Sequence, residues 1–276
     1  MTLITPKIKS ATVKLKTDRP VQKTPYQVKG VLMKNFPNDE IVPMLNGSYR
    51  KKFLYPRIQV KIVDEEILLV GIHQGVEPIL AIHEKIKDLN FGDITFDVLE
   101  KSVQVSEEAF FFSSSIHKYK FLSNWVALNI NTSKKYDLKK DEDKLQYLND
   151  LIAKNIVFIA REMGFELPKN IYSKISVSDL NPIKLDQNGW RAFDGEFYSN
   201  IILPDYIGIG NGITRGYGTI NGSHSDDILP FDNKEFEELK LESENSHFSL
   251  DSENFCSTLF EAVSYTHLTL PTNREV

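Results

Sequence analysis

A run of five glycines within eleven residues, 208–218, restricts this chain more than any other feature of its sequence. Glycine lowers the stability of a helix or strand that contains it, and it allows the φ angles above 0° that tight loops need. The run therefore predicts a loop, and the isoleucine and tyrosine residues beside it predict that one strand enters and another leaves. A single arginine, Arg215, lies inside the run. Backbone N–H groups and a guanidinium together favour an anionic ligand.

The overall composition is typical of a soluble globular protein with room for two ordinary domains. The chain has 276 residues, of which 41% are hydrophobic and 26% are charged. No apolar run approaches the roughly 18–20 residues that span a bilayer, and the N-terminus lacks the apolar core of a signal peptide. One cysteine, Cys256, excludes an internal disulfide and a cysteine-based metal cluster. We therefore expect a cytoplasmic protein that does not contact a membrane.

The net charge of −5 conceals a strong polarity along the chain. Residues 1–61 contain 13 lysines and arginines but only three acidic residues. Such a basic segment either attracts a polyanion through its phosphates or is a solvated charged face, and the sequence leaves both open. Residues 223–262 contain eleven acidic residues and two lysines, and they are rich in Glu, Ser and Asn. This composition predicts an acidic appendage at the periphery of the protein.

The sequence of the first predicted domain, residues 1–122, predicts several strands and one helix. Residues 11–17 and 52–63 alternate apolar with basic or polar side chains, which is typical of half-buried strands. Residues 67–72 return as the second arm of a hairpin. Residues 75–86 have helical spacing with a proline in the first turn. The order strand, connection, hairpin, helix, strand fits a ferredoxin-like unit, so we expect an α+β fold.

The second predicted domain, residues 123–222, contains the strongest helix signal in the chain. Residues 144–163 form an apolar stripe with helical spacing, and Gly164 ends it. Strands are expected at 171–177, 191–203 and 216–220, with the glycine-rich loop between the last two.

The last fourteen residues, 263–276, differ abruptly from the acidic sequence before them, because they carry no charge until their end. They resemble the peptide encoded when sequencing-adaptor DNA is read through. We therefore expect residues 263–276 to be a non-native tail without a role in function.

Several elements in one order resemble a known family. They are the basic N-terminal half, the strand Tyr55-Pro-Arg-Ile-Gln-Val-Lys61, the turn Gly71-Ile-His-Gln-Gly75, Trp125 with the residues after it, and the glycine-rich loop. Together they resemble the CRISPR repeat-processing endoribonucleases, the sixth Cas protein family of the RAMP superfamily. The resemblance covers about residues 10–222 of the 276. It implies two tandem ferredoxin-like (RRM-like) domains, CRISPR repeat RNA as the substrate, and a Cas interference complex as a further partner.

The resemblance also implies a chemistry without a metal or any other cofactor. The ribose 2′-OH attacks the adjacent phosphodiester and leaves a 2′,3′-cyclic phosphate and a 5′-OH. Many members carry one or two histidines shortly before the Tyr-Pro strand, but residues 43–52 of this chain contain none. Tyr49, Lys51 and Lys52 replace them by position, as proton carriers or as cations that stabilise the phosphorane. His73, at the hairpin exit, is the fourth catalytic candidate.

These candidates have alternatives. Tyr49, Lys51 and Lys52 could only bind phosphates, so the protein is either an endoribonuclease or a catalytically inactive module that binds crRNA. A ferredoxin-like scaffold for protein interactions is a third possibility.

The expected RNA-binding residues come from the Tyr-Pro strand and from the glycine-rich loop. In the strand, basic residues alternate with apolar ones, so one face of the sheet could carry a cationic strip. In the loop, Arg215 could clamp a phosphate or pair with Asp205. The predicted RNA-binding residues are Arg57, Lys61, Gly208, Gly210, Gly212, Arg215, Gly216 and Gly218.

Overall fold

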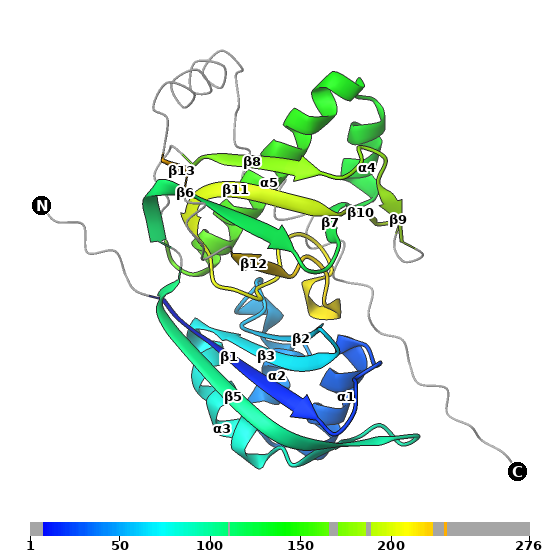
Figure 1. Cartoon of the computed structure of the whole chain (residues 1–276), viewed down its shortest axis with the longest axis vertical. Helices are drawn as coiled ribbons and strands as arrows, with labels where there is room; N and C mark the ends of the chain where they lie inside the picture. The colour runs from blue at the N-terminus through cyan, green and yellow to red at the C-terminus, as the bar shows by residue number, and fades with distance from the viewer. Residues whose placement is uncertain (1–7, 110, 166–170, 186–188, 223–228, 231–276) are drawn as a thin grey trace, which may run out of the picture.

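The computed structural model describes residues 8–109, 111–165, 171–185, 189–222 and 229–230. These residues form two halves, one above the other in Figure 1, and each half is built on an antiparallel sheet. The predicted acidic appendage, residues 223–262, lies outside the described residues except for the short strand β13 (Leu229–Pro230). The predicted tail, residues 263–276, lies wholly outside them.

The first half has the strand order of a ferredoxin-like fold. Its sheet runs β2-β3-β1-β5-β4, so the first strand lies between the hairpin and the last long strand. This confirms the predicted α+β class. The elements are β1 (Ile8–Thr17), α1 (Pro25–Asn35), α2 (Ile41–Leu45), the 3-10 helix η1 (Ser48–Lys51), β2 (Ile58–Val63), β3 (Glu66–Ile72), the 3-10 helix η2 (His73–Gly75), α3 (Val76–Lys85), β4 (Asp88–Asn90) and β5 (Thr95–Ala109).

Helix α1 is an element that the sequence reading above treated only as a connection. Thr24 accepts the N–H of Gln27, the Gln27 side chain accepts the N–H of Thr24, and Pro25 occupies the first turn. This is a capping box with proline at the first helical position, a local signal for a helix start. Helices α1 and α3 cover one face of the first sheet with buried side chains that include Val28, Leu32 and Ile79.

The second half also follows the ferredoxin order, with one helix replaced. Its main sheet runs β12-β6-β11-β8. In a βαββαβ unit a second helix would connect the third strand to the fourth, here β11 to β12. That connection is instead the glycine-rich loop, whose helical part is only the short η3. The elements are β6 (Phe111–Phe121), β7 (Trp125–Leu128), α4 (Ile130–Asp137), α5 (Asp141–Glu162), β8 (Ser173–Val177), β9 (Ile183–Lys184), β10 (Arg191–Phe193), β11 (Gly195–Ile202), the 3-10 helix η3 (Ile213–Arg215) and β12 (Ile220–Gly222).

Helix α5 confirms the strongest sequence prediction. Its apolar stripe is buried against residues of the second sheet. Three acidic residues in its first turn stabilise the helix, because their negative charges lie at the positive end of the helix dipole. A small sheet, β7-β10-β9, lies beside the main one. Among the helices of the described residues, α5 included, none combines the length and apolarity that a membrane span requires.

The predicted division between the domains at residue 122 needs a correction. Residues 111–121 form β6, which pairs with β11 and β12 and so belongs to the second sheet. The strand before it, β5, pairs with β1 and β4 of the first sheet. Strand pairing therefore favours a division near residue 110. Local alternation could not show this, because β5 and β6 both read as strands and only their partners differ.

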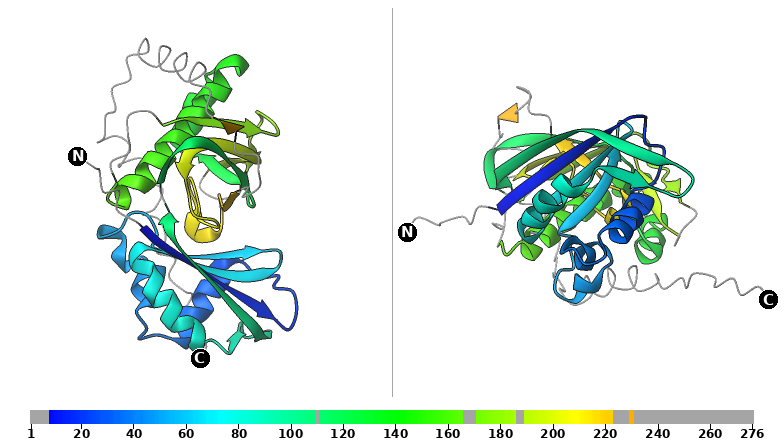
Figure 2. Two further views of the ribbon diagram at one scale, coloured as in Figure 1. Left: turned by 60° about the vertical axis from the view of Figure 1, so that its left-hand side comes forward. Right: turned by 90° about the horizontal axis from the view of Figure 1, so that it is seen from below.

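The two halves share one hydrophobic cluster. Tyr55, Val70 and Ile72 of the first half are buried together with Ile207 and Ile209 of the second. Figure 2 (left) shows the yellow loop after β11 between the two halves. The second face of the first sheet is therefore covered by the second half, and the glycine-rich loop lies at the junction.

Candidate functional site

A pocket lies where the two halves meet, between the segment around η1 and the glycine-rich loop. Its volume is about 130 Å³. The lining combines residues between 44 and 57, residues 210–215, and the side chains of Phe158 and Trp190. The predicted catalytic residue Tyr49 thus shares one pocket with several predicted RNA-binding residues, which are Arg57, Gly210, Gly212 and Arg215.

Tyr49 and Arg50 reach the pocket because a glycine turn precedes them. Gly47 has a φ of 86°, which favours glycine, and a Cβ at this position would lie 2.7 Å from Nε of Arg50. The Asn46 side chain accepts the N–H of Ser48 at 2.8 Å and so fixes the start of η1. The Tyr49 side chain is 38% exposed and therefore accessible to a ligand.

The Tyr-Pro strand holds the glycine-rich loop by hydrogen bonds from three of its side chains. The Tyr55 hydroxyl donates to the carbonyl of Gly208 at 2.8 Å, and the Gly208 N–H donates to Oε1 of Gln59 at 2.8 Å. Nζ of Lys61 donates to the carbonyl of Ile213 at 3.4 Å. Two motifs that lie about 150 residues apart in sequence therefore form one structural unit.

The glycines of the loop are needed for close packing. A Cβ on Gly218 would lie 1.9 Å from a backbone carbonyl oxygen, and one on Gly210 would lie 2.8 Å from the Trp125 ring. Gly212 and Gly216 have φ angles of 72° and 93°. The N–H groups of Gly208, Gly216 and Gly218 donate inside the protein. An open row of N–H groups for an anion, which the sequence suggested, is therefore not what most of these glycines provide.

Within the glycine-rich loop, Arg215 still has a donor group that could bind an anion. Its guanidinium carbon lies 5.2 Å from the centroid of the Trp190 ring, a cation–π contact. Its Nη1 is buried and has no hydrogen-bond partner within the described structure. The pairing with Asp205 that the sequence left open is not found among the described residues, and Asp205 accepts the N–H of Gly222 at 2.7 Å instead. A buried guanidinium nitrogen without a partner is suited to an anionic oxygen.

Two arginines lie close enough to Lys29 at this end of the molecule to act on its charge. Burial, followed by the charges of Arg50 and Arg215, lowers the pKa of the Lys29 ammonium. Burial also lowers the pKa of the Arg50 guanidinium. We call Lys29, Arg50 and Arg215 the cation cluster. Both arginines repel Lys29, so binding of an anion beside these charges is favourable.

Lys29 and Arg50 were not among the candidates chosen from sequence. Arg50 stands between two of those candidates, Tyr49 and Lys51, so its position carried the same signal. Lys29 had no such signal, because helix α1 had not been recognised.

Two residues that were predicted to bind RNA, Arg57 and Lys61, are buried where the two halves of the protein meet. Arg57 is only 4% exposed, and it donates to the side chain of Gln74 at 2.9 Å and to the carbonyl of Glu162 at 2.5 Å. The Glu162 carboxylate in turn accepts the N–H groups of Leu54 and Tyr55. Arg57 therefore joins β2 to the end of α5, although its side chain still borders the pocket.

Lys61 was also predicted to bind RNA, but its side chain is 0% exposed and lies beneath the glycine-rich loop. Burial lowers the pKa of its ammonium to about 7. The expected cationic strip on this sheet therefore does not include Lys61 or Arg57. Alternation predicted which face each side chain occupies, but it could not show that the second half covers that face.

The remaining catalytic candidates, Lys51, Lys52 and His73, are not among the residues that line the pocket. Lys51 and Lys52 are exposed, and Nζ of Lys52 lies 5.8 Å from the centroid of the Tyr49 ring. His73 is exposed at the start of η2, with a φ of 52°. No histidine lines the pocket within the described ranges. Across those same ranges, no group of His, Cys, Asp and Glu side chains is arranged to hold a metal ion.

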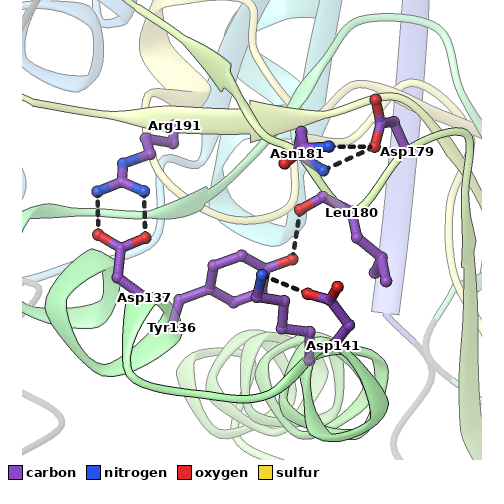
Figure 3. Close-up of polar contacts among 8 residues, drawn as sticks. Tyr136, Asp137, Asp141, Asp179, Leu180, Asn181 and Arg191 are labelled. Atoms are coloured by element: carbon purple, nitrogen blue, oxygen red, sulfur yellow. Dashed lines mark hydrogen bonds and ion pairs between the residues drawn. The ribbon is translucent and has the colours of Figure 1, made fainter.

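A polar network anchors the segment that carries Trp190 (Figure 3). The Arg191 guanidinium donates to both oxygens of Asp137, at 2.6 and 2.5 Å. The Tyr136 hydroxyl donates to the carbonyl of Leu180 at 2.7 Å. These contacts tie α4 to β10 directly after Trp190, so they help to fix the ring on which Arg215 lies.

Comparison with known proteins gives matches over both halves of the chain. A family model for the Cas6b N-terminal domain matches residues 6–109, and one for the Cas6b C-terminal domain matches residues 111–223. The two matches meet where strand pairing divides the chain.

Two solved structures named Cas6b are similar to the chain, and a curated relative matches about half of it. A crystal structure of Cas6b is 26% identical, with a TM-score of 0.64, and the match covers 79% of this chain and 100% of that one. A second, the CRISPR RNA processing endoribonuclease Cas6b, is 25% identical with a TM-score of 0.57, and the match covers 78% and 100%. The uncharacterized protein MJ0978 of Methanocaldococcus jannaschii is 26% identical over 135 residues, which are 49% of this chain and 92% of the relative.

Proposed function

The chain belongs to the Cas6b family, and from this premise we propose that it is a cytoplasmic endoribonuclease that cuts CRISPR precursor RNA within each repeat. The observation that carries the proposal is the pocket between the two halves, where an accessible tyrosine shares the lining with Arg215, whose buried Nη1 has no hydrogen-bond partner within the described residues. The solved structure described as a CRISPR RNA processing endoribonuclease is similar to this chain over 78% of this chain's length. Transfer of the product to a Cas interference complex is a further part of the proposal.

The reaction that suits this site is an intramolecular transesterification. The 2′-oxygen of a ribose attacks the adjacent phosphorus, the bond from phosphorus to the 5′-oxygen breaks, and a 2′,3′-cyclic phosphate and a 5′-OH result. The 2′-OH loses its proton and the departing 5′-oxygen gains one, so hydrogen is balanced. The protein must align the attack, stabilise the doubly charged phosphorane and move the protons.

The cation cluster would bind the scissile phosphate. Nη1 of Arg215 has a buried donor without a partner, and Lys29 and Arg50 contribute positive charge nearby. These charges act most strongly when negative charge builds up on the phosphorane, so they would favour the transition state over the ground state. Tyr49 is the pocket-lining residue that would exchange a proton with the substrate, with Lys51, Lys52 and His73 as the remaining candidates.

A second function deserves the same test, because no histidine lines the described pocket. Histidine is the commonest proton carrier at neutral pH. In this alternative the protein is a catalytically inactive module that binds crRNA. The pocket, the cation cluster and the loop would then hold the phosphate without cleaving the chain.

One assay separates the two functions. Purified protein is incubated with its cognate repeat RNA in EDTA, and the ends of the products are identified. A fragment with a 5′-OH and its partner with a 2′,3′-cyclic phosphate support the endoribonuclease. Tight binding with intact RNA supports the binding module. An affinity that is absent, or that does not fall as salt is added, would contradict both functions and favour a protein-interaction scaffold.

Two substitutions assign the roles within the pocket. Arg215→Ala should weaken binding and cleavage, because it removes the unpartnered donor. Tyr49→Phe should slow cleavage by about 100-fold while binding stays within twofold, because only the hydroxyl is lost. Lys16→Ala is the matched control, since Lys16 lies on β1 and pairs with Glu100 at 3.6 Å. If Tyr49→Phe cleaves normally while the double variant of Lys51 and Lys52 does not, the proton transfer belongs to the lysines.

A further inference from the structure

An aromatic side chain, Tyr26, stands exposed on α1 beside the cation cluster. Its side chain is 61% exposed, the largest exposure among the aromatic residues recorded as exposed in the described chain. Nζ of Lys29, one helical turn further on, lies 4.9 Å from the centroid of the Tyr26 ring. One face of the Tyr26 ring is therefore contacted by a cation, while most of the side chain stays accessible to a ligand.

The pair formed by Tyr26 and Lys29 differs in charge from three other lysine–aromatic pairs of the molecule. In each of these three pairs the lysine also forms an ion pair with an acidic residue. Lys23, which lies over Phe91, pairs with Asp93. Lys118, over Tyr198, pairs with Glu196, and Lys144, over Tyr136, pairs with Asp141. The charged neighbours that act on Lys29 are two cations, Arg50 and Arg215. Lys29 therefore lies in a positive field set by two arginines rather than beside an acidic residue.

Tyr26 is also held rigidly next to the glycine-rich loop. It occupies the first turn of α1, directly after Pro25, and the capping box of Thr24 fixes that turn. A Cβ on Gly216 would lie 2.6 Å from Cγ of Pro25, so the helix start and the loop are in direct contact. Arg215 is the neighbour of Gly216 in sequence. A rigid aromatic residue and an anion site thus lie on either side of this contact.

From this arrangement we propose that Tyr26 and Lys29 form a stacking subsite for one unpaired nucleotide of the RNA. The base stacks on the Tyr26 ring, and the phosphate of the same nucleotide lies against Lys29 and the cation cluster. Stacking on aromatic side chains is the usual way in which proteins bind unpaired bases, and it tolerates any base. The subsite rests on the proposed function, since it binds the nucleotide next to the phosphate that the pocket holds.

The test uses the full protein and a series of repeat RNAs with 2′-O-methyl riboses, which cannot be cleaved. Each RNA carries 2-aminopurine at one position, and both fluorescence change and affinity are measured. We expect the wild type to quench 2-aminopurine at one unpaired position. Tyr26→Ala should abolish that change and weaken binding about 10-fold, whereas Tyr26→Phe should retain both. Tyr198→Ala is the matched control, because Tyr198 also contacts a lysine but that lysine is neutralised by Glu196.

The outcomes separate the two proposals. If the wild type binds and Tyr26→Ala matches it within twofold with the same fluorescence, the stacking subsite is refuted and the proposed function stands. If the wild type does not bind the repeat at all, the proposed function itself fails. Should Tyr26→Ala not fold, Tyr26→Leu, which keeps apolar bulk and helix propensity, should show the same loss of quenching.

Discussion

Lys61 offers the sharpest test of the structure, because a lysine buried beneath a loop should destabilise the protein. Its side chain is 0% exposed, and its Nζ donates one hydrogen bond of 3.4 Å to the carbonyl of Ile213. Burial lowers the pKa of the ammonium from 10.5 to about 7. We predict that Lys61→Met, which keeps the length of the side chain and removes the charge, stabilises the protein at neutral pH.

The size of the effect follows from the two pKa values. The folded protein releases the proton at a lower pH than the unfolded chain does, so the folded state is penalised wherever the unfolded lysine is still charged. The penalty is complete below pH 7, at about 5 kcal/mol, shrinks as the pH rises from 7 to 10.5, and is absent above. It amounts to about 4 kcal/mol at pH 7 and about 2 kcal/mol at pH 9. Lys61→Met also removes the hydrogen bond to Ile213, and this loss reduces the gain in the free energy of unfolding by about 1 kcal/mol. The net gain is then about 3 kcal/mol at pH 7 and about 1 kcal/mol at pH 9.

The assay is urea unfolding of both proteins between pH 6 and 9.5, followed by the fluorescence of Trp125 and Trp190. Lys14→Met is the control, because Lys14 is exposed and bonded to Glu66, which raises its pKa. Its contribution to stability should be constant over this range, since its proton leaves only at higher pH. A gain for Lys61→Met that is the same at pH 6.5 and pH 9, or a loss at pH 7, would refute the reasoning.

Three further predictions concern the loop, the junction and the polar network. Gly218→Ala should lower the free energy of unfolding by more than 2 kcal/mol in urea titrations, because its Cβ would lie 1.9 Å from a carbonyl oxygen. Gly92→Ala, with φ of 95° and nothing within 4 Å, should cost only about 1 kcal/mol, and equal losses would contradict the packing argument. Glu162→Ala should cost about 2 kcal/mol by leaving two N–H groups without an acceptor, and Glu162→Gln should cost less. Asp137→Ala should cost at most about 1 kcal/mol, because its pair with Arg191 is partly exposed, and 1 M NaCl should reduce the difference.

The sequence predicted the fold well where local patterns decide structure. The apolar stripe of α5 and the hairpin of β2 and β3 are each defined by periodicity, and both were found. Apolar spacing did not predict helix α1, because its apolar stripe is weak, although its capping box is a local signal. Residues 111–121 were assigned to the wrong half because strand identity does not reveal strand partners.

The candidate site was predicted in part. Tyr49 and Arg215, which the sequence assigned to different domains and different roles, line one pocket, whereas Lys61 and Arg57 are buried at the junction. Lys29 was assigned to the site because burial and the charges of Arg50 and Arg215 lower the pKa of its ammonium. These differences arise because burial and charge coupling depend on residues that are far from each candidate in the sequence.

By itself, the sequence determined the α+β class, the glycine-rich loop and the family resemblance, because turn chemistry, side-chain alternation and motif order are properties of short segments. Only the tertiary structure decided what the loop does. Packing of the second half on the first sheet places Tyr55, Gln59 and Lys61 beneath the loop and leaves Arg215 with an unused donor beside Trp190. The physical reason is that desolvation and mutual repulsion of charges act through space, so the same lysine or arginine becomes a buried support or a phosphate site according to what covers it.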